Sequence, residues 1–164
     1  MRILLVDDHA VMRKGMISLL GEHFENMEFG EADDARHGLS AALEGGWDLV
    51  IADIGLPGRS GLDLIQEIRS AKPDLKVLVV SAHSERDYAV RALKLGAAGY
   101  VSKQSAADTL ISAVKRVFSG GRYVSPALAE HLAGAISGTA HEASHDALSN
   151  RELQVLRMIA NGMT

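Results

Sequence analysis

Short runs of apolar residues recur along this chain, and they constrain its fold more than any other feature. Three of the runs are rich in β-branched residues: Ile3 to Val6, Leu49 to Ala52 and Val77 to Val80. Continuous apolar runs of this length are typical of strands that are buried on both faces of a sheet. Weaker patterns predict two more strands, near Met27 to Glu31 and at Gly99 to Val101.

Helical patterns lie between these strands. Apolar residues recur every three or four positions in three segments, which contain Met12, Met16, Leu19 and Leu20, then Leu62, Ile65 and Ile68, then Leu110, Val114, Val117 and Phe118. We expect further helices from Asp34 to Leu43 and from Glu85 to Leu95. Such alternation implies right-handed crossovers and a parallel sheet that carries helices on both faces. The sequence therefore predicts an α/β fold, doubly wound around a five-stranded parallel sheet.

The regular alternation ends after Phe118, where Ser-Gly-Gly at 119–121 breaks the last helix. Pro126 can open a short apolar helix, and residues 137–147 have no apolar period, which is typical of a flexible linker. Ser149 and Glu152 then form a capping box at the start of another helix. We expect one domain over residues 1–120, a linker with a short helix over 121–147, and the start of an all-α unit over 148–164.

The composition narrows the possible classes of function. A net charge of −4 and a pI of about 5.9 give the chain as a whole no electrostatic footprint for nucleic acid. The chain contains no cysteine, which excludes disulfides and thiolate chemistry. No apolar run approaches the roughly 18 residues of a membrane span. We therefore expect a soluble cytoplasmic protein with no membrane partner.

Chemically active side chains follow several of the predicted strands. They are Asp7 and Asp8 after the first strand, Asp53 after the third, Ser81 after the fourth and Lys103 after the fifth. Because the carboxyl ends of parallel strands meet at one edge of a sheet, we expect these groups to converge. Three acids, a hydroxyl and an amine are the components of a phosphoryl-transfer site.

The acids suggest how such a site would work. Asp7 and Asp8 beside a third acid would repel one another by roughly 4 kcal/mol per close pair at an effective dielectric of about 20. Mg²⁺ would remove this conflict, because it prefers oxygen ligands and can use two carboxylates and a loop carbonyl. The Asp53 carboxylate could then attack phosphorus and form an aspartyl phosphate. Lys103 could pair with the phosphoryl oxygens, and the Ser81 hydroxyl could donate to one of them.

Each of these residues also has an ordinary structural explanation. Asp53 could be a turn or N-cap residue, and Asp8 and Ser81 could each cap the helix that follows them. Lys103 could be a solvated loop lysine, and Tyr100 a half-buried strand aromatic. Four strand ends that carry complementary chemistry in this order are a more specific signal than any single member.

The motifs at these strand ends resemble those of a known family. They are Val-Asp-Asp at 6–8, Ala-Asp-Ile-Gly-Leu-Pro-Gly at 52–58, Val-Val-Ser-Ala at 79–82 and Gly-Tyr-Val-Ser-Lys at 99–103. Residues 1–118 resemble the receiver domain of bacterial two-component response regulators, whose fold is a flavodoxin-like (βα)5 sheet. Residues 148–164 resemble the opening of a LuxR-type helix-turn-helix domain. Together the two segments resemble the NarL/FixJ subfamily of transcriptional regulators.

The resemblance implies a role for each site residue. Asp53 would be the phosphoacceptor, Lys103 the phosphoryl-binding lysine, and Ser81 and Tyr100 the switch pair. The ligands of Mg²⁺ would be Asp7, Asp8, Asp53 and the backbone carbonyl of Gly55. In the family the hydroxyl moves toward the phosphoryl group and the aromatic ring turns inward behind it. His83 falls at a position that tunes phosphoryl lifetime in such proteins, but we expect a half-exposed loop histidine rather than a base.

The resemblance also implies partners. A sensor histidine kinase would donate the phosphoryl group, and phosphorylation would favour a homodimer. The dimer would use the two helices predicted around residues 85–95 and 106–118, or the latter with that around 12–20. The full-length protein would bind DNA, but the sequence ends after the first of the four helices of a LuxR-type domain. Since the recognition helix comes later, we expect this chain to bind DNA weakly or not at all.

Two other functions remain open at this level. A phosphatase of the haloacid-dehalogenase type also forms an aspartyl phosphate after a strand. That class places a second acid two residues after the nucleophile, where this chain has Gly55. A receiver-like interaction module that works without phosphate is the third possibility. Because every chemical position is filled, we favour a phosphoacceptor signalling protein that catalyses only its own phosphorylation and dephosphorylation.

Overall fold

The computed structural model describes residues 1–105 and 107–130. Strands and helices alternate strictly, as β1 (Arg2–Val6), α1 (Ala10–His23), β2 (Glu28–Ala32), α2 (Ala35–Glu44), β3 (Leu49–Ala52), α3 (Gly61–Ala71), β4 (Lys76–Ser81), α4 (Glu85–Lys94), β5 (Gly99–Ser102) and α5 (Ala107–Phe118). The predicted alternation of strands and helices is therefore confirmed. The linker expected beyond residue 130 and the helix-turn-helix segment expected at 148–164 lie outside the described residues.

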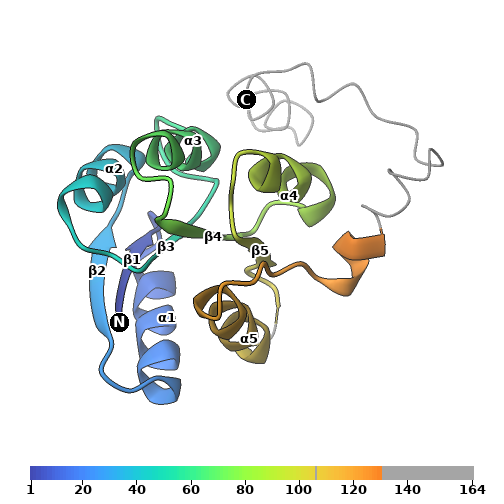
Figure 1. Ribbon diagram of the computed structural model, residues 1–164, viewed down its shortest axis with the longest axis horizontal. Coiled ribbons are helices and arrows are strands. Elements are labelled where there is room, and N and C mark those ends of the chain that lie inside the picture. Colours follow the sequence, from blue (N-terminus) through green and yellow to red (C-terminus); the bar gives the residue numbers. More distant parts are fainter. Residues whose placement is uncertain (106, 131–164) are drawn as a thin grey trace.

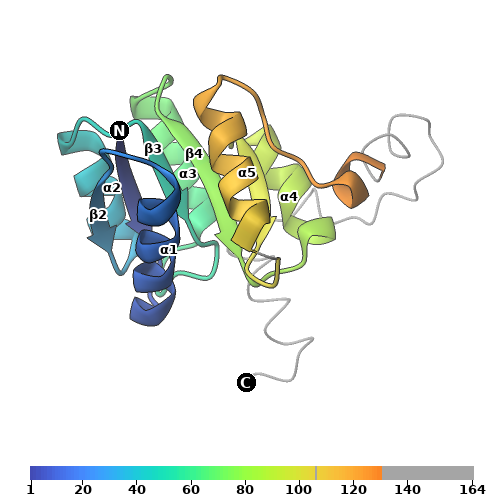
Figure 2. The ribbon, with the colours of Figure 1, turned by 90° about the horizontal axis from the view of Figure 1, so that it is seen from below.

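All the strand pairs are parallel, and the order across the sheet is β2-β1-β3-β4-β5. The chain moves outward from β1 to β2 and then returns to the other side of β1 with β3. This reversal creates a switch point outside the carboxyl ends of β1 and β3, the place where open α/β sheets bind ligands. Figures 1 and 2 show helices covering both faces of the twisted sheet.

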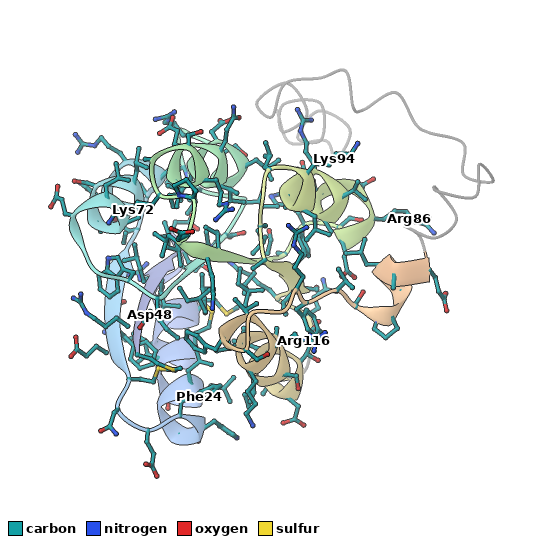
Figure 3. All side chains as sticks on the ribbon, in the orientation of Figure 1. Phe24, Asp48, Lys72, Arg86, Lys94 and Arg116 are labelled. Carbon is teal, nitrogen blue, oxygen red and sulfur yellow. The ribbon has the colours of Figure 1, made fainter. Side chains whose placement is uncertain are left out.

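Each face of the sheet has its own hydrophobic core. Leu4 and Val6 of β1 face a cluster with α2, α3 and α4, whereas Ile3 and Leu5 face a cluster with α1 and α5. Both faces of the central strands are thus buried, which explains why their sequences are continuous apolar runs. Charged side chains such as Arg86 and Lys94 of α4 project away from the sheet (Figure 3). Among the described residues no helix has the length and apolar character needed to cross a membrane.

The starts of the helices test two of the ordinary explanations for the site residues. The residue at the N-cap of α1 is His9, and that of α4 is Ser84. Asp8 and Ser81 therefore occupy neither N-cap. By contrast, Asp34 caps α2 by accepting a hydrogen bond from the backbone of His37 at 2.7 Å. The polar residues at the ends of β1 and β4 serve some purpose other than helix capping.

Candidate functional site

Lys103 joins two acids at the carboxyl edge of the sheet. Its Nζ lies 2.7 Å from Oδ2 of Asp53 and 2.6 Å from Oδ2 of Asp7. The Lys103 side chain is only 8% exposed, and those of Asp7 and Asp53 are 2% and 6% exposed. Lys103 is therefore a buried partner of both acids and not a solvated loop lysine. The expected convergence of Asp7, Asp53 and Lys103 is what the structure shows.

Backbone hydrogen bonds hold these strand ends side by side. The N–H of Asp53 donates to the carbonyl of Val6 at 2.9 Å, and the N–H of Lys103 donates to the carbonyl of Ser81 at 2.8 Å. The first turn of α3 lies directly behind the site. A Cβ on Gly61 would lie 2.0 Å from the carbonyl oxygen of Asp53, so only glycine allows this approach. The sheet and α3 together fix the position of the Asp53 carboxylate.

The Asp53 carboxylate is held in its ionised form. Burial is the largest influence and raises the pKa of Asp53, but hydrogen bonds from Lys103 and Ser81 together lower it below its usual value. Burial is the largest single influence on the pKa of Lys103 and lowers it. Hydrogen bonds and charges from Asp53 and Asp7 together outweigh burial, so the pKa of Lys103 lies above its usual value. Oδ1 of Asp53 also accepts a hydrogen bond from the N–H of Gly55 at 3.1 Å. Asp53 thus makes a local turn contact as well, but its main partner is the lysine.

The acidic edge has the chemistry of a divalent cation site. Ligand atoms from Asp7, Asp8, His9 and Asp53 all lie within 4.8 Å of one another. Oδ2 of Asp7 is buried and accepts no hydrogen bond of good geometry, although the Lys103 ammonium is close by. Because three carboxylates supply hard oxygen ligands, the donor set fits Mg²⁺. His9 was not predicted here; its only sequence signal is that it follows the acids directly.

Ser81 and Tyr100 share the backbone of His83 as a hydrogen-bond partner. Both residues have no exposed surface. The Tyr100 hydroxyl donates to the His83 carbonyl at 2.9 Å, and the His83 N–H donates to Oγ of Ser81 at 3.3 Å. Burial raises the pKa of the Tyr100 hydroxyl, so it stays protonated and available as a donor. Tyr100 is thus a fully buried residue whose ring points inward, rather than a half-buried one.

The imidazole of His83 lies over Gly55. A Cβ on Gly55 would lie 3.2 Å from Nε2 of His83 and 3.6 Å from Oδ2 of Asp53. The ring also packs against Tyr88, with the centroids 4.9 Å apart. His83 therefore sits in the β4–α4 loop, at the wall of the pocket that contains Asp53. The structure supplies no second acid at residue 55, the position a haloacid-dehalogenase phosphatase would require.

A pocket of about 620 Å³ opens onto Asp53. The pocket is lined by Asp53, Ser81 and Lys103 and by Val11 and other residues of α1. Val11 is a large apolar side chain that is 87% exposed beside this cluster of charges. The carboxylate is therefore accessible from solvent through an opening with one apolar rim.

The site thus combines a buried lysine shared by two strand-end acids with a hydroxyl and an inward tyrosine, at the carboxyl edge of a flavodoxin-like sheet. Residues 3–115 match the family described as the response regulator receiver domain. This match covers more than half of the chain, and the chain belongs to that family. Members of this family are generally signalling proteins rather than metabolic enzymes.

Relatives extend the similarity over almost the whole chain. The response regulator GacA of Pseudomonas aeruginosa is 35% identical over 161 residues, which are 98% of this chain and 75% of that protein. The response regulator UvrY of Escherichia coli is 32% identical over 161 residues, which are 98% of this chain and 74% of that protein. The expected resemblance to two-component regulators of the NarL/FixJ type is confirmed.

Solved structures agree with this assignment. A two-component response regulator of the LuxR family from Aurantimonas sp. SI85-9A1 superposes with a TM-score of 0.74 and 31% identity, covering 83% of this chain and 97% of that one. A CheY-like receiver domain from Methanospirillum hungatei gives a TM-score of 0.67 with 27% identity, covering 73% of this chain and 94% of that one. The flavodoxin-like fold expected from the sequence is confirmed.

Proposed function

We propose that Asp53 accepts a phosphoryl group from a sensor histidine kinase and that this event switches the protein between two conformations. The observation that carries the proposal is the buried ammonium of Lys103, held between the carboxylates of Asp53 and Asp7. A lysine in this position keeps Asp53 ionised. It is also close enough to pair with a phosphoryl group that arrives at Asp53.

In the proposed reaction an oxygen of the Asp53 carboxylate attacks the phosphorus atom of a phosphohistidine. A bond forms between that oxygen and phosphorus, the bond between phosphorus and the donor's imidazole nitrogen breaks, and the nitrogen keeps the electron pair. Asp7, Asp8, Asp53 and the Gly55 carbonyl would hold Mg²⁺, which supplies neutralisation of the phosphoryl charge. Lys103 pairs with a phosphoryl oxygen, and the Ser81 hydroxyl donates to another.

The switch follows from the charge that is added. A phosphoryl group brings about −1.5 to −2 charges and three acceptor oxygens. These acceptors would draw Ser81 toward Asp53 and with it the backbone of His83, which holds the Tyr100 hydroxyl. The inward ring of Tyr100 is the arrangement that such a shift would stabilise. Phosphorylation would thereby favour one conformation of the α4–β5 face and promote a homodimer.

The partners of this cycle are proposed on the same basis. The exposed apolar rim at Val11 would let the kinase's phosphohistidine domain dock beside the pocket. RcsB of Salmonella enterica, 25% identical with a TM-score of 0.75, has been solved bound to promoter DNA with a phosphomimetic; the match covers 99% of this chain and 78% of that one. We infer that this protein also acts by binding DNA.

Phosphorylation by a small-molecule phosphodonor tests the proposal directly. In the presence of Mg²⁺ the protein should take up one phosphate, measured by intact-protein mass, and lose it in neutral hydroxylamine as an acyl phosphate does. Asp53→Asn should abolish the uptake. Asp74→Asn is the matched control, because Asp74 is an exposed aspartate before β4. Equal uptake by Asp53→Asn would refute the assignment, and no uptake by the unaltered protein would favour a phosphate-independent module.

A further inference from the structure

The segment that follows α5 folds back along the open edge of the sheet. β5 is an edge strand, and the chain reaches it again after a turn at Gly120, whose φ is +85°. The N–H of Tyr123 donates to the carbonyl of Ala98 at 2.8 Å, and Tyr123 forms a parallel bridge with Gly99. Figures 1 and 2 show this segment in orange, running from α5 past β5 toward α4. We call residues 122–130 the edge strap.

The edge strap contacts the cores on both faces of the sheet. Tyr123 packs against the cluster of α1 and α5, whereas Val124 packs against the cluster of α2, α3 and α4. Leu128 is only 2% exposed and belongs to the second of these clusters. A stretch whose sequence is typical of a linker is therefore partly built into the receiver domain.

Local features of the sequence fix the strap in this position. Oγ of Ser125 accepts a hydrogen bond from the N–H of Leu128 at 3.1 Å, which is an N-cap interaction. Pro126, at the next position, suits the first turn of a helix because it needs no backbone donor there. On the sheet side, a Cβ on Gly99 would lie 2.7 Å from the carbonyl oxygen of Tyr123. The cap presents Leu128 to the core, and the glycine lets the strap approach the strand.

The strap and Tyr100 belong to the same buried cluster inside the domain. Gly99, which bridges to the strap, directly precedes Tyr100. Leu128 and the inward ring of Tyr100 lie in the same buried cluster, together with Tyr88 and Ala92 of α4. If the Tyr100 ring turned outward, its volume would leave this cluster and the packing around Leu128 would loosen. Docking of the strap and the inward position of the ring therefore support one another.

We propose that the edge strap reports the state of the phosphorylation site to the part of the chain beyond residue 130. The strap docks more firmly when the Tyr100 ring is inward and loosens when it is outward. This inference rests on the proposed phosphorylation of Asp53. Because coupling between two sites is reciprocal, a firmly docked strap also strengthens the binding of a phosphoryl group at Asp53.

Hydrogen exchange on the full chain tests the direction of the coupling. With Mg²⁺ present, beryllofluoride should slow the exchange of peptides that cover residues 122–130. A peptide from β2, on the opposite edge of the sheet, is the internal control and should not change. Fluorine NMR shows independently whether beryllofluoride is bound. Bound beryllofluoride with unchanged exchange in the strap would overturn this inference alone, whereas absence of any bound beryllofluoride would overturn the proposed function with it.

A pair of variants tests reciprocity. Leu128→Ala should weaken the affinity for beryllofluoride by roughly fivefold or more, the lower end of typical coupling between sites. Ala127→Ser, at an exposed neighbouring position, should leave that affinity unchanged. Leu128→Val guards against a folding defect and should give a smaller loss in the same direction. Affinities equal to that of the unaltered protein for both Leu128 variants would overturn the proposed coupling.

Discussion

Replacement of Lys103 by methionine, which has similar length and no charge, is the most direct test of how this site is held together. The change removes an ammonium that lies 2.7 Å from Asp53 and 2.6 Å from Asp7. The two carboxylates would remain in a part of the protein where their side chains are 6% and 2% exposed. Without Mg²⁺ no other cation lies between them among the residues that the structure describes.

The expected loss of stability can be estimated from these distances. Ligand atoms of Asp7 and Asp53 lie within 4.8 Å of each other. Two unit charges at about that separation repel by roughly 3.5 kcal/mol at an effective dielectric of about 20. Removal of one partner from a buried ion pair typically costs about 3–5 kcal/mol. Both estimates predict that Lys103→Met lowers the free energy of unfolding by about 3–4 kcal/mol at neutral pH.

Urea unfolding in a metal-free buffer measures this loss. Lys14→Met is the matched control, because Lys14 pairs with Glu31 but its side chain is 72% exposed. Its loss should stay below about 1 kcal/mol. Millimolar Mg²⁺ should restore part of the stability of Lys103→Met and none of that of Lys14→Met. A loss for Lys103→Met no larger than that of the control would refute the idea that the ammonium neutralises both acids.

The pH dependence of the same variant has a defined sign. In the unaltered protein the pKa of Asp53 lies below its usual value, so its contribution to stability is present at neutral pH and is lost as the pH falls through the pKa in the folded state. Without Lys103, burial remains the dominant influence and raises the pKa of Asp53. Protonation of Asp53 then removes the repulsion between Asp53 and Asp7 in the variant, so the difference in stability between the two proteins should shrink in acid. A difference that is constant from neutral pH to about pH 4 would contradict this account.

Two further substitutions probe the metal ligands and the support behind Asp53. Asp7→Asn should weaken Mg²⁺ binding by at least about tenfold, as measured by calorimetry, since a full charge on a ligand is worth several kcal/mol even at an effective dielectric of about 20. Unchanged affinity for Mg²⁺ would show that Asp7 is not a ligand. Gly61→Ala places a Cβ 2.0 Å from the carbonyl oxygen of Asp53 and should cost about 1–3 kcal/mol of stability and slow phosphate uptake. Gly15→Ala, which meets nothing within 4 Å in α1, should instead be neutral or stabilising.

The fold was predictable because its strands are buried on both faces. Burial on both faces requires continuous apolar runs, and these locate β1, β3 and β4 in the sequence without ambiguity. β2 has no such run, since Glu28 and Glu31 are exposed at the other edge of the sheet. Its pattern was accordingly weak, although its position was predicted correctly to within one residue. The sequence could not supply the strand order, which decides which strand ends become neighbours.

The candidate site was predictable as a set of residues but not as a set of contacts. The parallel sheet brings Asp7, Asp53 and Lys103 to one edge, as expected. One ammonium serves both acids because of the direction in which the lysine side chain points. No sequence pattern encodes that direction. The helix that Pro126 opens was predicted and is present in the structure, but the docking of the edge strap was missed. The strap pairs with β5 at a single bridge and contributes only Tyr123, Val124 and Leu128 to the cores, a pattern too short to distinguish a docked segment from a linker.

In the proposed cycle the shared lysine would link the metal to the phosphoryl group. In the structure the positive charge of Lys103 is divided between Asp53 and Asp7. A phosphoryl group on Asp53 adds about −1.5 to −2 charges and takes a larger part of that ammonium. Asp7 is buried, and its Oδ2 lacks a well-oriented hydrogen-bond donor. Neutralisation of the Asp7 charge would then depend more on a cation at the acidic edge. Since binding free energies are reciprocal, a cation bound at Asp7 and Asp8 must stabilise the phosphorylated form to the same extent. We therefore expect the two halves of the site to act cooperatively in the proposed cycle, because one lysine cannot neutralise both.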